Sequence, residues 1–246
     1  FTFPHIGNVG TNDEDIETVN PASRGLIVRE DITNPSSWRS QKHFDVWLKS
    51  YNLPGICDVD TRALTRLIRD GGAPVGIICH APDGKFDLKA LHEEAKSWPG
   101  LEGRDLAKEV SCTQMYKWDE AQWVLGQGYQ KQTNPKYKVV AVDYGAKRNI
   151  LRCLAAAGCE VVVVPGNSSA EDVMSDKPDG VVLSNGPGDP AATGKYAVPM
   201  IKALLGKNIP IFGICLGHQM LALALGGETT KMNLGHRGAN QPVKDL

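Results

Sequence analysis

Short apolar runs alternate with helix-like segments through the second half of the chain. Four runs are apolar throughout and indicate buried strands, at residues 139–142, 161–164, 181–183 and 209–212. The segments that follow them predict helices, over residues 148–157, 170–174, 196–205 and 216–225. Glycines at 158, 206 and 226 stand where three of these helices would end. This alternation predicts a parallel sheet with helices on both faces.

The first half of the chain has a less regular pattern. Apolar residues recur at helical spacing in three segments, which span residues 44–51, 64–68 and 88–95. Asp60 or Thr61 could cap the second of these helices, and Gly71 could end it. Residues 25–28 and 75–79 have the composition of strands. We therefore predict an α+β domain here, ahead of the α/β domain.

A polar stretch separates the two patterns. Residues 126–138 contain glycine, lack hydrophobic periodicity and are typical of an interdomain linker. The expected organisation is therefore an N-terminal domain over residues 1–127, a linker over 128–138 and a second domain over 139–246.

Composition narrows the class of protein. The 246 residues are 41% hydrophobic and 22% charged, as in soluble globular proteins. A formal net charge of −1 gives no electrostatic reason to expect nucleic acid or a membrane surface as a partner, and no apolar run is long enough to span a bilayer. None of the six cysteines forms a C-x-x-C pair, so neither a zinc site nor a redox motif is indicated. We expect reduced thiols and a cytoplasmic location.

One cysteine stands in a distinctive setting. Cys215 lies between Gly213 and Gly217, after an apolar run and before a predicted helix. This is the arrangement of a nucleophile elbow, in which glycines relieve backbone crowding around the nucleophile. The helix N-terminus that follows would favour a thiolate and could hold a developing oxyanion. A small buried cysteine is the alternative, but the flanking glycines have no evident packing purpose.

Several segments resemble known families. Residues 213–219, GICLGHQ, resemble the nucleophile segment of the class I (triad) glutamine amidotransferases, and residues 183–190, LSNGPGDP, resemble their oxyanion and glutamine-binding loop. Three further segments resemble the small subunits of carbamoyl phosphate synthetases: FPHIGNVG at 3–10, DTRALTR at 60–66 and GHRGANQPVK at 235–244. This second resemblance runs over the whole chain.

The resemblance implies roles for five residues. Cys215 would be the catalytic nucleophile, and the backbone N–H groups of Leu216 and Gly188 would hold the oxyanion. Gly186, Gly188, Leu216 and Gln219 would contact the substrate glutamine. From the residues alone, Gly186–Gly188 could equally be an ordinary tight turn, and Gln219 could face solvent or cap a helix.

The general base is not evident in this sequence. His218 is close to Cys215, but its position on the elbow helix favours a structural histidine directed away from the thiol. In the family the base lies in a His-Pro-Glu segment, and none of the histidines here is followed by Pro-Glu. His236 stands in a different family segment. We therefore expect a chain truncated at both ends and inactive alone, with its catalytic His/Glu pair beyond residue 246.

The resemblance implies the glutamine-hydrolysing subunit of a carbamoyl phosphate synthetase. Such a subunit forms a γ-glutamyl thioester at the cysteine and passes ammonia to a large subunit, which makes carbamoyl phosphate from bicarbonate. The expected partners are L-glutamine and that large subunit, with no nucleic acid and no membrane. No metal or cofactor is expected in this chain, since ATP and Mg²⁺ would bind the large subunit.

Two other classes remain open. A stand-alone triad amidotransferase would lack the first-domain motifs, and a non-catalytic interaction subunit would not need Cys215. Arg62, Arg66 and Arg69 form a basic stripe on the second predicted helix; a solvated face is the favoured interpretation, and an acidic partner is the alternative.

Overall fold

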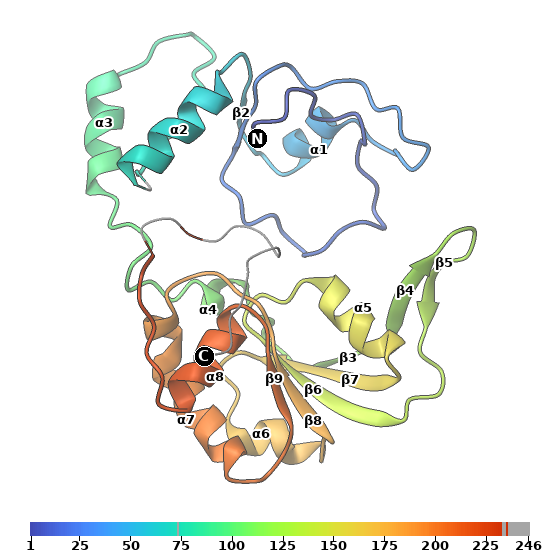
Figure 1. Cartoon of the computed structure of the whole chain (residues 1–246). Helices are drawn as coiled ribbons and strands as arrows, with labels where there is room; N and C mark the ends of the chain where they lie inside the picture. The colour runs from blue at the N-terminus through green and yellow to red at the C-terminus, as the bar shows by residue number, and fades with distance from the viewer. Residues whose placement is uncertain (73, 233–234, 236–246) are drawn as a thin grey trace. The chain divides into compact units, whose positions relative to one another are not determined.

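The computed structural model describes residues 1–246 except 73, 233–234 and 236–246 (Figure 1). The chain divides into two compact units. The first comprises residues 1–15, 21–99 and the described residues after 229; the second comprises residues 16–20 and 100–229. No helix in the described part is long and apolar enough to cross a membrane.

The second unit is built on a five-stranded sheet in the order β3-β7-β6-β8-β9. Its strands are β3 (Tyr116–Trp118), β6 (Tyr137–Asp143), β7 (Cys159–Pro165), β8 (Gly180–Leu183) and β9 (Ile211–Gly213). All pairs are parallel except that between β3 and β7. The connecting helices are α5 (Arg148–Ala156), α6 (Ala170–Ser175) and α7 (Pro190–Leu205), and α8 (Leu216–Ala224) follows β9. The predicted α/β class is confirmed.

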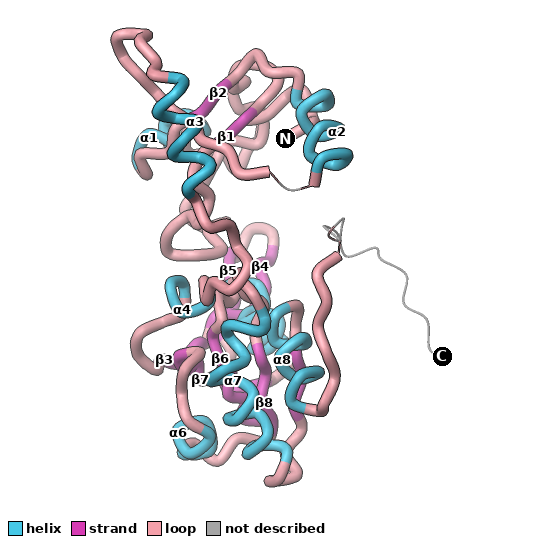
Figure 2. The backbone as a smooth tube through the Cα atoms, turned by 90° about the vertical axis from the view of Figure 1, so that its left-hand side faces the viewer, coloured by secondary structure: helices cyan, strands magenta, loops and turns pink. Residues whose placement is uncertain are grey.

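Both faces of this sheet are buried. Along β6, Val140 and Val142 pack in one apolar cluster with residues of α6, α7 and α8. The alternating residues Val139 and Ala141 pack in a second cluster with Leu151 of α5. Because side chains alternate between the faces of a strand, a strand covered on both sides must be apolar throughout. Figure 2 shows α7 and α8 side by side along the sheet.

Helix α7 is longer than the sequence pattern predicts. It begins at Pro190 rather than at residue 196. Asp189 caps it, because its Oδ1 accepts a hydrogen bond of 2.8 Å from the Ala191 N–H, and Pro190 occupies the first turn, where no partner for a backbone N–H is needed. The small residues of the first two turns, Gly194 among them, hide the helical periodicity. The helix therefore starts directly after the loop at 185–189.

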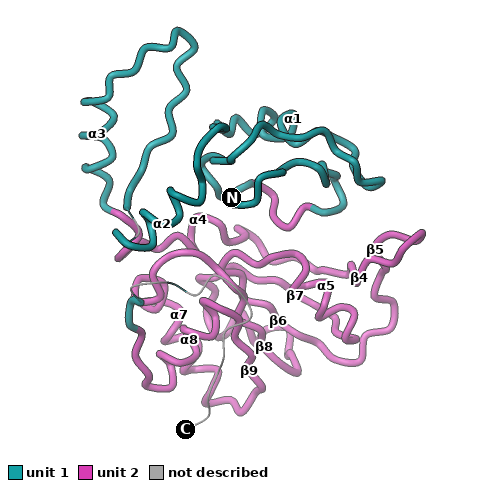
Figure 3. Tube along the Cα trace, turned by 45° about the horizontal axis from the view of Figure 1, so that its top comes forward, with its two compact units in different colours: residues 1–15, 21–99, 230–246 teal, residues 16–20, 100–229 magenta. Residues whose placement is uncertain are grey.

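The expected linker is partly regular structure. Residues 128–131 form β5 (Gly128–Lys131), which pairs antiparallel with β4 (Glu120–Val124). Positive φ angles at Gly126 (79°) and Gly128 (73°) shape the turn, so the glycines that indicate a linker in the sequence belong to a hairpin. The compact units divide at residues 99/100 (Figure 3), which differs from the expected boundary at 127/128.

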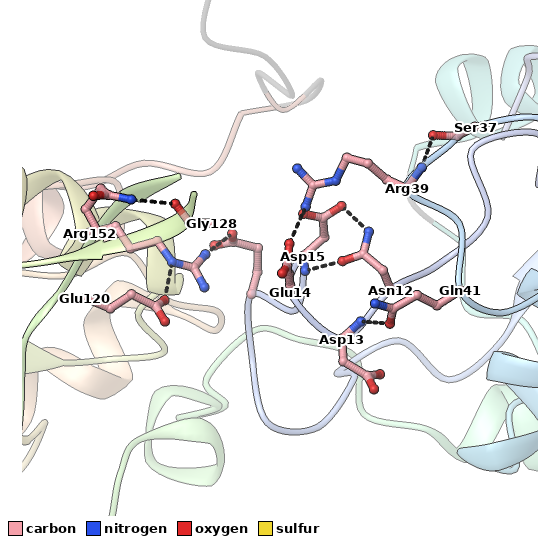
Figure 4. Close-up of polar contacts among 12 residues, drawn as sticks. Asn12, Asp13, Glu14, Asp15, Ser37, Arg39, Gln41, Glu120, Gly128 and Arg152 are labelled. Atoms are coloured by element: carbon pink, nitrogen blue, oxygen red, sulfur yellow. Dashed lines mark hydrogen bonds and ion pairs between the residues drawn. The ribbon is translucent and has the colours of Figure 1, made fainter. Parts of the chain in front are cut away.

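The first unit contains the three predicted helices: α1 (Phe44–Ser50), α2 (Thr61–Gly71) and α3 (Leu88–Ser97). Of the two candidate caps, Asp60 fills the role, since its Oδ1 accepts a hydrogen bond of 3.0 Å from the Ala63 N–H. The strand β1 (Leu26–Ile27) pairs parallel with β2 (Gly55–Ile56). In the same unit, the Arg39 guanidinium forms an ion pair of 2.7 Å with the Asp15 carboxylate (Figure 4).

The strand predicted at residues 75–79 is wrong. These residues have no strand conformation, and Val75 and Ile77 are 41% and 38% exposed. A strand needs a neighbour to satisfy its backbone groups, and the described residues of this unit supply none to this segment. A β-branched composition alone therefore misled the prediction.

Arg152 anchors the β4–β5 hairpin to α5. Its side chain is 3% exposed, and it bonds Glu17 at 3.0 Å and Glu120 at 2.7 Å (Figure 4 shows the second pair). Its guanidinium also lies 3.8 Å from the centroid of the Tyr129 ring. A planar cation can make two ion pairs and a stacking contact at once, which an ammonium cannot. The sequence gives no sign that this arginine is buried.

We predict that Arg152→Met lowers the free energy of unfolding by about 2 kcal/mol, because the half-exposed carboxylates of Glu17 and Glu120 lose their charge-assisted hydrogen bonds. Arg152→Lys should recover only part of this loss. Lys131→Met is the matched control on the same hairpin, since its pair with Asp119 is exposed on both sides and its loss should leave the unfolding midpoint nearly unchanged. Urea unfolding measures all three; equal midpoints would contradict the anchoring role.

Candidate active site

Cys215 lies at a strained turn between β9 and α8. It is the N-cap of α8, with φ 54° and ψ −110°, and its side chain is exposed. A positive φ is uncommon for a residue other than glycine and carries an energetic cost. Such strain persists where the surrounding structure enforces it, and it is typical of nucleophile elbows. The structure thus places the thiol at a helix N-terminus and at the carboxyl edge of the sheet.

The two flanking glycines are required by space. A Cβ on Gly213 would lie 2.7 Å from the carbonyl carbon of Gly217 and from the Cα of His218. A Cβ on Gly217 would overlap the Leu183 carbonyl group and lie 2.7 Å from the Leu183 Cβ. The elbow therefore closes on itself and on the end of β8, which explains the Gly-x-Cys-x-Gly spacing.

Backbone hydrogen bonds attach the elbow to β8. The Ile214 N–H donates to the Leu183 carbonyl at 2.9 Å, and the Gly217 N–H donates to the Ser184 carbonyl at 3.1 Å. Both acceptors are at the carboxyl end of β8, directly before the loop at 185–189. Residues that are 31 and 33 positions apart in sequence are thereby joined at one edge of the sheet.

The structure brings Gly186 beside the elbow. A Cβ on Gly186 would overlap the Tyr144 carbonyl oxygen and lie 2.9 Å from the Leu216 Cδ2. Gly188 has φ 98°, and a Cβ there would lie 2.8 Å from the Leu106 nitrogen and 2.9 Å from the Arg104 carbonyl oxygen. An ordinary tight turn would not need glycine at both positions. Glycines here allow the loop backbone to pack directly against the neighbouring segments of this unit.

The groups expected to bind the oxyanion are open in the described part of the chain. Within those residues, the structure gives no hydrogen-bond partner to the N–H of Leu216 or of Gly188. Gln219 is exposed on α8, and its backbone N–H donates to the Cys215 carbonyl at 3.0 Å. The five residues expected at the site therefore lie on the elbow, on the first turns of α8 and on the facing loop.

The general base has no visible candidate among the described residues. His218 is exposed on α8, and no histidine of this part of the chain is hydrogen-bonded to Cys215. His236 lies outside the described residues. Across the same residues, no group of three or more His, Cys, Asp or Glu side chains is placed to hold a metal ion.

The other thiols differ in their surroundings. Burial, with the nearby Asp143 carboxylate, raises the pKa of the Cys112 thiol to about 12. Burial also raises the pKa of Cys159. Cys57, Cys79 and Cys153 are exposed, as Cys215 is. Cys215 differs from these exposed thiols in its position at the N-terminus of a helix.

Three residues that build this edge carry no role in the family resemblance, although Ser184 and Asn185 lie within the LSNGPGDP segment at 183–190. Asp143 ends β6 and accepts hydrogen bonds from the N–H groups of Cys112, Gly145 and Ala146 at 2.7–2.8 Å. The side chains of Ser184 and Asn185 make further hydrogen bonds at the start of the loop at 185–189. Their position at the carboxyl ends of strands was a usable signal, because sites in open α/β sheets lie there.

Two parts of the chain match the descriptions of known protein families. Residues 140–246 match the family described as glutamine amidotransferase class-I, and these residues carry both the elbow and the loop at 185–189. Residues 1–78 match a second description, the CPSase domain of the carbamoyl-phosphate synthase small chain.

Curated relatives narrow the class to one family. Carbamoyl phosphate synthase small chains of Bradyrhizobium diazoefficiens, Rhizobium meliloti and Ruegeria pomeroyi are each 59% identical to this chain. The similarity covers 100% of this chain and 63%, 63% and 64% of those proteins. Over its whole length, the chain is similar to carbamoyl phosphate synthase small chains. It spans a little under two thirds of the length of these relatives.

We predict that Gly217→Ala disrupts the elbow, because its methyl group would overlap the Leu183 carbonyl. A loss of about 1–3 kcal/mol in unfolding free energy is expected, as for other overpacked sites. Gly206→Ala is the matched control: Gly206 has φ −66°, and the nearest atom to its Cβ would be 3.6 Å away. Urea unfolding of both variants measures the difference, and equal stability would contradict the required close contact.

We also predict that Cys215 reacts fastest with iodoacetamide. At pH 8 a thiol with a pKa near 12 is ionised to only about 1 part in 10,000, so Cys112 should remain unlabelled. Labelling at less than one equivalent, followed by peptide mapping, identifies the modified thiol, and Cys215→Ser should remove the fast phase. Preferential modification of Cys153 or Cys159 would contradict the prediction.

Proposed function

We propose that this chain forms the glutamine-hydrolysing part of a carbamoyl phosphate synthase. The observation that carries the proposal is the strained elbow at Cys215 beside the loop at 185–189. A strained backbone at an exposed cysteine costs free energy that a purely structural residue has no reason to require. The similarity to carbamoyl phosphate synthase small chains supports the same reaction class.

The chemistry proceeds in two steps. The Cys215 thiolate attacks the side-chain amide carbon of glutamine, and the N–H groups of Leu216 and Gly188 stabilise the oxyanion that develops. The C–N bond breaks, ammonia leaves with an added proton, and a γ-glutamyl thioester remains on Sγ. Water then attacks the thioester, which releases glutamate and the free thiol.

Binding roles follow the same geometry. The resemblance assigns glutamine contacts to Gly186 and Gly188, whose bare backbone lets the loop lie close to Leu216 and Leu106. Gln219 presents an exposed amide one turn after the nucleophile. The proton transfers need a base, which the resemblance assigns to a histidine oriented by a glutamate in a His-Pro-Glu segment.

The ammonia is used by a partner in this proposal. The relatives are named as small chains, which supports a complex with a large chain that binds ATP and Mg²⁺. The first unit exposes large apolar side chains, including Trp38 at 75%, Leu67 at 65% and Leu88 at 75%. Where such side chains gather into one patch, they are typical of surfaces that dock to another protein. We expect the interface to bury at least roughly 1,600 Å² in total.

The test uses the whole protein that contains this chain, with and without its large-chain partner. We expect glutaminase activity that rises when the partner, ATP and bicarbonate are present, because hydrolysis without ammonia consumption is wasteful. Cys215→Ser should lower kcat by roughly a million-fold, as loss of a nucleophile does in other triads. Glutamate release measures the rate, and light scattering measures the mass of the complex.

Cys153→Ser is the matched control, since this thiol is also exposed but lies on α5, and it should leave the rate unchanged. A rate that ignores the partner and ATP, with no complex formed, would favour a stand-alone amidotransferase. Absence of any glutaminase activity in the complex would favour a non-catalytic interaction subunit.

A further inference from the structure

We propose that Ser184 and Asn185 are positioning residues that hold the loop at 185–189 in register with the elbow. The inference rests on the proposed function and assigns these two side chains a part in it. Neither needs to touch the substrate: each acts by placing the backbone of Gly186–Gly188 beside Leu216.

Ser184 joins three segments at a fully buried point. Its side-chain Oγ accepts a hydrogen bond of 2.9 Å from the Tyr144 N–H and donates one of 2.8 Å to the Asn185 carbonyl. Its backbone carbonyl accepts the bond from the Gly217 N–H at 3.1 Å. One residue, 0% exposed, therefore connects the end of β6, the start of the loop and the elbow. At this depth each lost partner would leave a polar group unsatisfied.

Asn185 ties the same loop to the turn after β6. Its Nδ2 donates a hydrogen bond of 3.0 Å to the Gly145 carbonyl, and its Oδ1 accepts one of 3.1 Å from the Lys147 N–H. An amide supplies a donor and an acceptor on one planar group, which a carboxylate of the same shape does not. This pair of bonds explains why asparagine stands directly before Gly186.

The turn that receives Asn185 is itself rigid. Asp143 is 6% exposed and accepts hydrogen bonds from the N–H groups of Gly145 and Ala146 at 2.8 and 2.7 Å. Charge-assisted bonds to backbone N–H groups are among the stronger hydrogen bonds in proteins. The Asn185 amide is therefore attached to a fixed support.

The far end of the loop is held independently. The Asp189 N–H donates to the Arg104 carbonyl at 3.0 Å, and the Asp189 Oδ2 accepts from the Gly103 N–H at 2.7 Å. Between these two anchors the Gly186 Cα lies against the Tyr144 carbonyl, with no room for a Cβ. Loss of the Asn185 or Ser184 bonds would free the near end of the loop while Asp189 retains the far end.

This arrangement has a kinetic consequence. A misplacement of about 1 Å in a catalytic group can cost on the order of 100-fold in rate. Donors to an oxyanion act mainly in the transition state, so their displacement lowers kcat and kcat/KM together. A residue that merely supported the fold would instead lower stability, and the surviving folded molecules would react at the normal rate.

The experiment compares Asn185→Asp and Ser184→Ala in the whole protein, in complex with its large chain. Asn185→Asp keeps the shape but loses the donor to the Gly145 carbonyl. Each variant should lower kcat and kcat/KM for glutamine hydrolysis by about 100-fold. Labelling of Cys215 by iodoacetamide should keep its normal rate, because alkylation forms no oxyanion. Asn134→Asp and Ser175→Ala are the matched controls, since both positions are exposed and lie away from the loop.

The outcomes separate the two proposals. Wild-type activity with a normal kcat in Asn185→Asp would overturn the positioning role and leave the proposed function intact. A fall in kcat accompanied by an equal fall in Cys215 labelling would show collapse of the elbow and would also overturn it. If the wild-type complex shows no glutaminase activity, the proposed function itself fails. Should Ser184→Ala not fold, Asn185→Asp alone decides the question.

Discussion

The rest of this structure depends on the direct backbone contact between the elbow and the end of β8. Gly217 lies against the Leu183 carbonyl with no space for a side chain, and its N–H donates to the Ser184 carbonyl. Because the elbow cannot move away from β8, Cys215 is held at a positive φ angle on the edge of the sheet.

That contact also explains how the loop and the nucleophile come together. The loop at 185–189 continues directly from β8, so whatever holds the elbow against β8 brings the loop beside it. The Ser184 and Asn185 side chains and the buried Asp143 carboxylate supply the remaining hydrogen bonds. Polar groups buried at this depth are favourable only when they are paired, and here each one is used to connect two segments.

The two units contribute differently to the proposed function. The second unit holds all five residues expected at the site, on a sheet whose two apolar faces are covered by helices. The first unit has a small core around Leu26, Val28 and Leu48 and holds none of the residues expected at the site. This difference fits a division between a catalytic part and a docking part, which the proposed complex would require.

The sequence by itself determined the elements whose signals are local. Apolar strands alternating with helices predicted the parallel sheet, and glycines around Cys215 predicted the elbow, because both follow from spacing within about ten residues. Tertiary structure decided the rest. The segment at 75–79 has strand composition but no neighbour to pair with, and the glycines of the expected linker turn a hairpin instead. The burial of Arg152 and the bonds of Ser184 and Asn185 join residues that are 32–135 positions apart along the chain, and no local pattern encodes such distances.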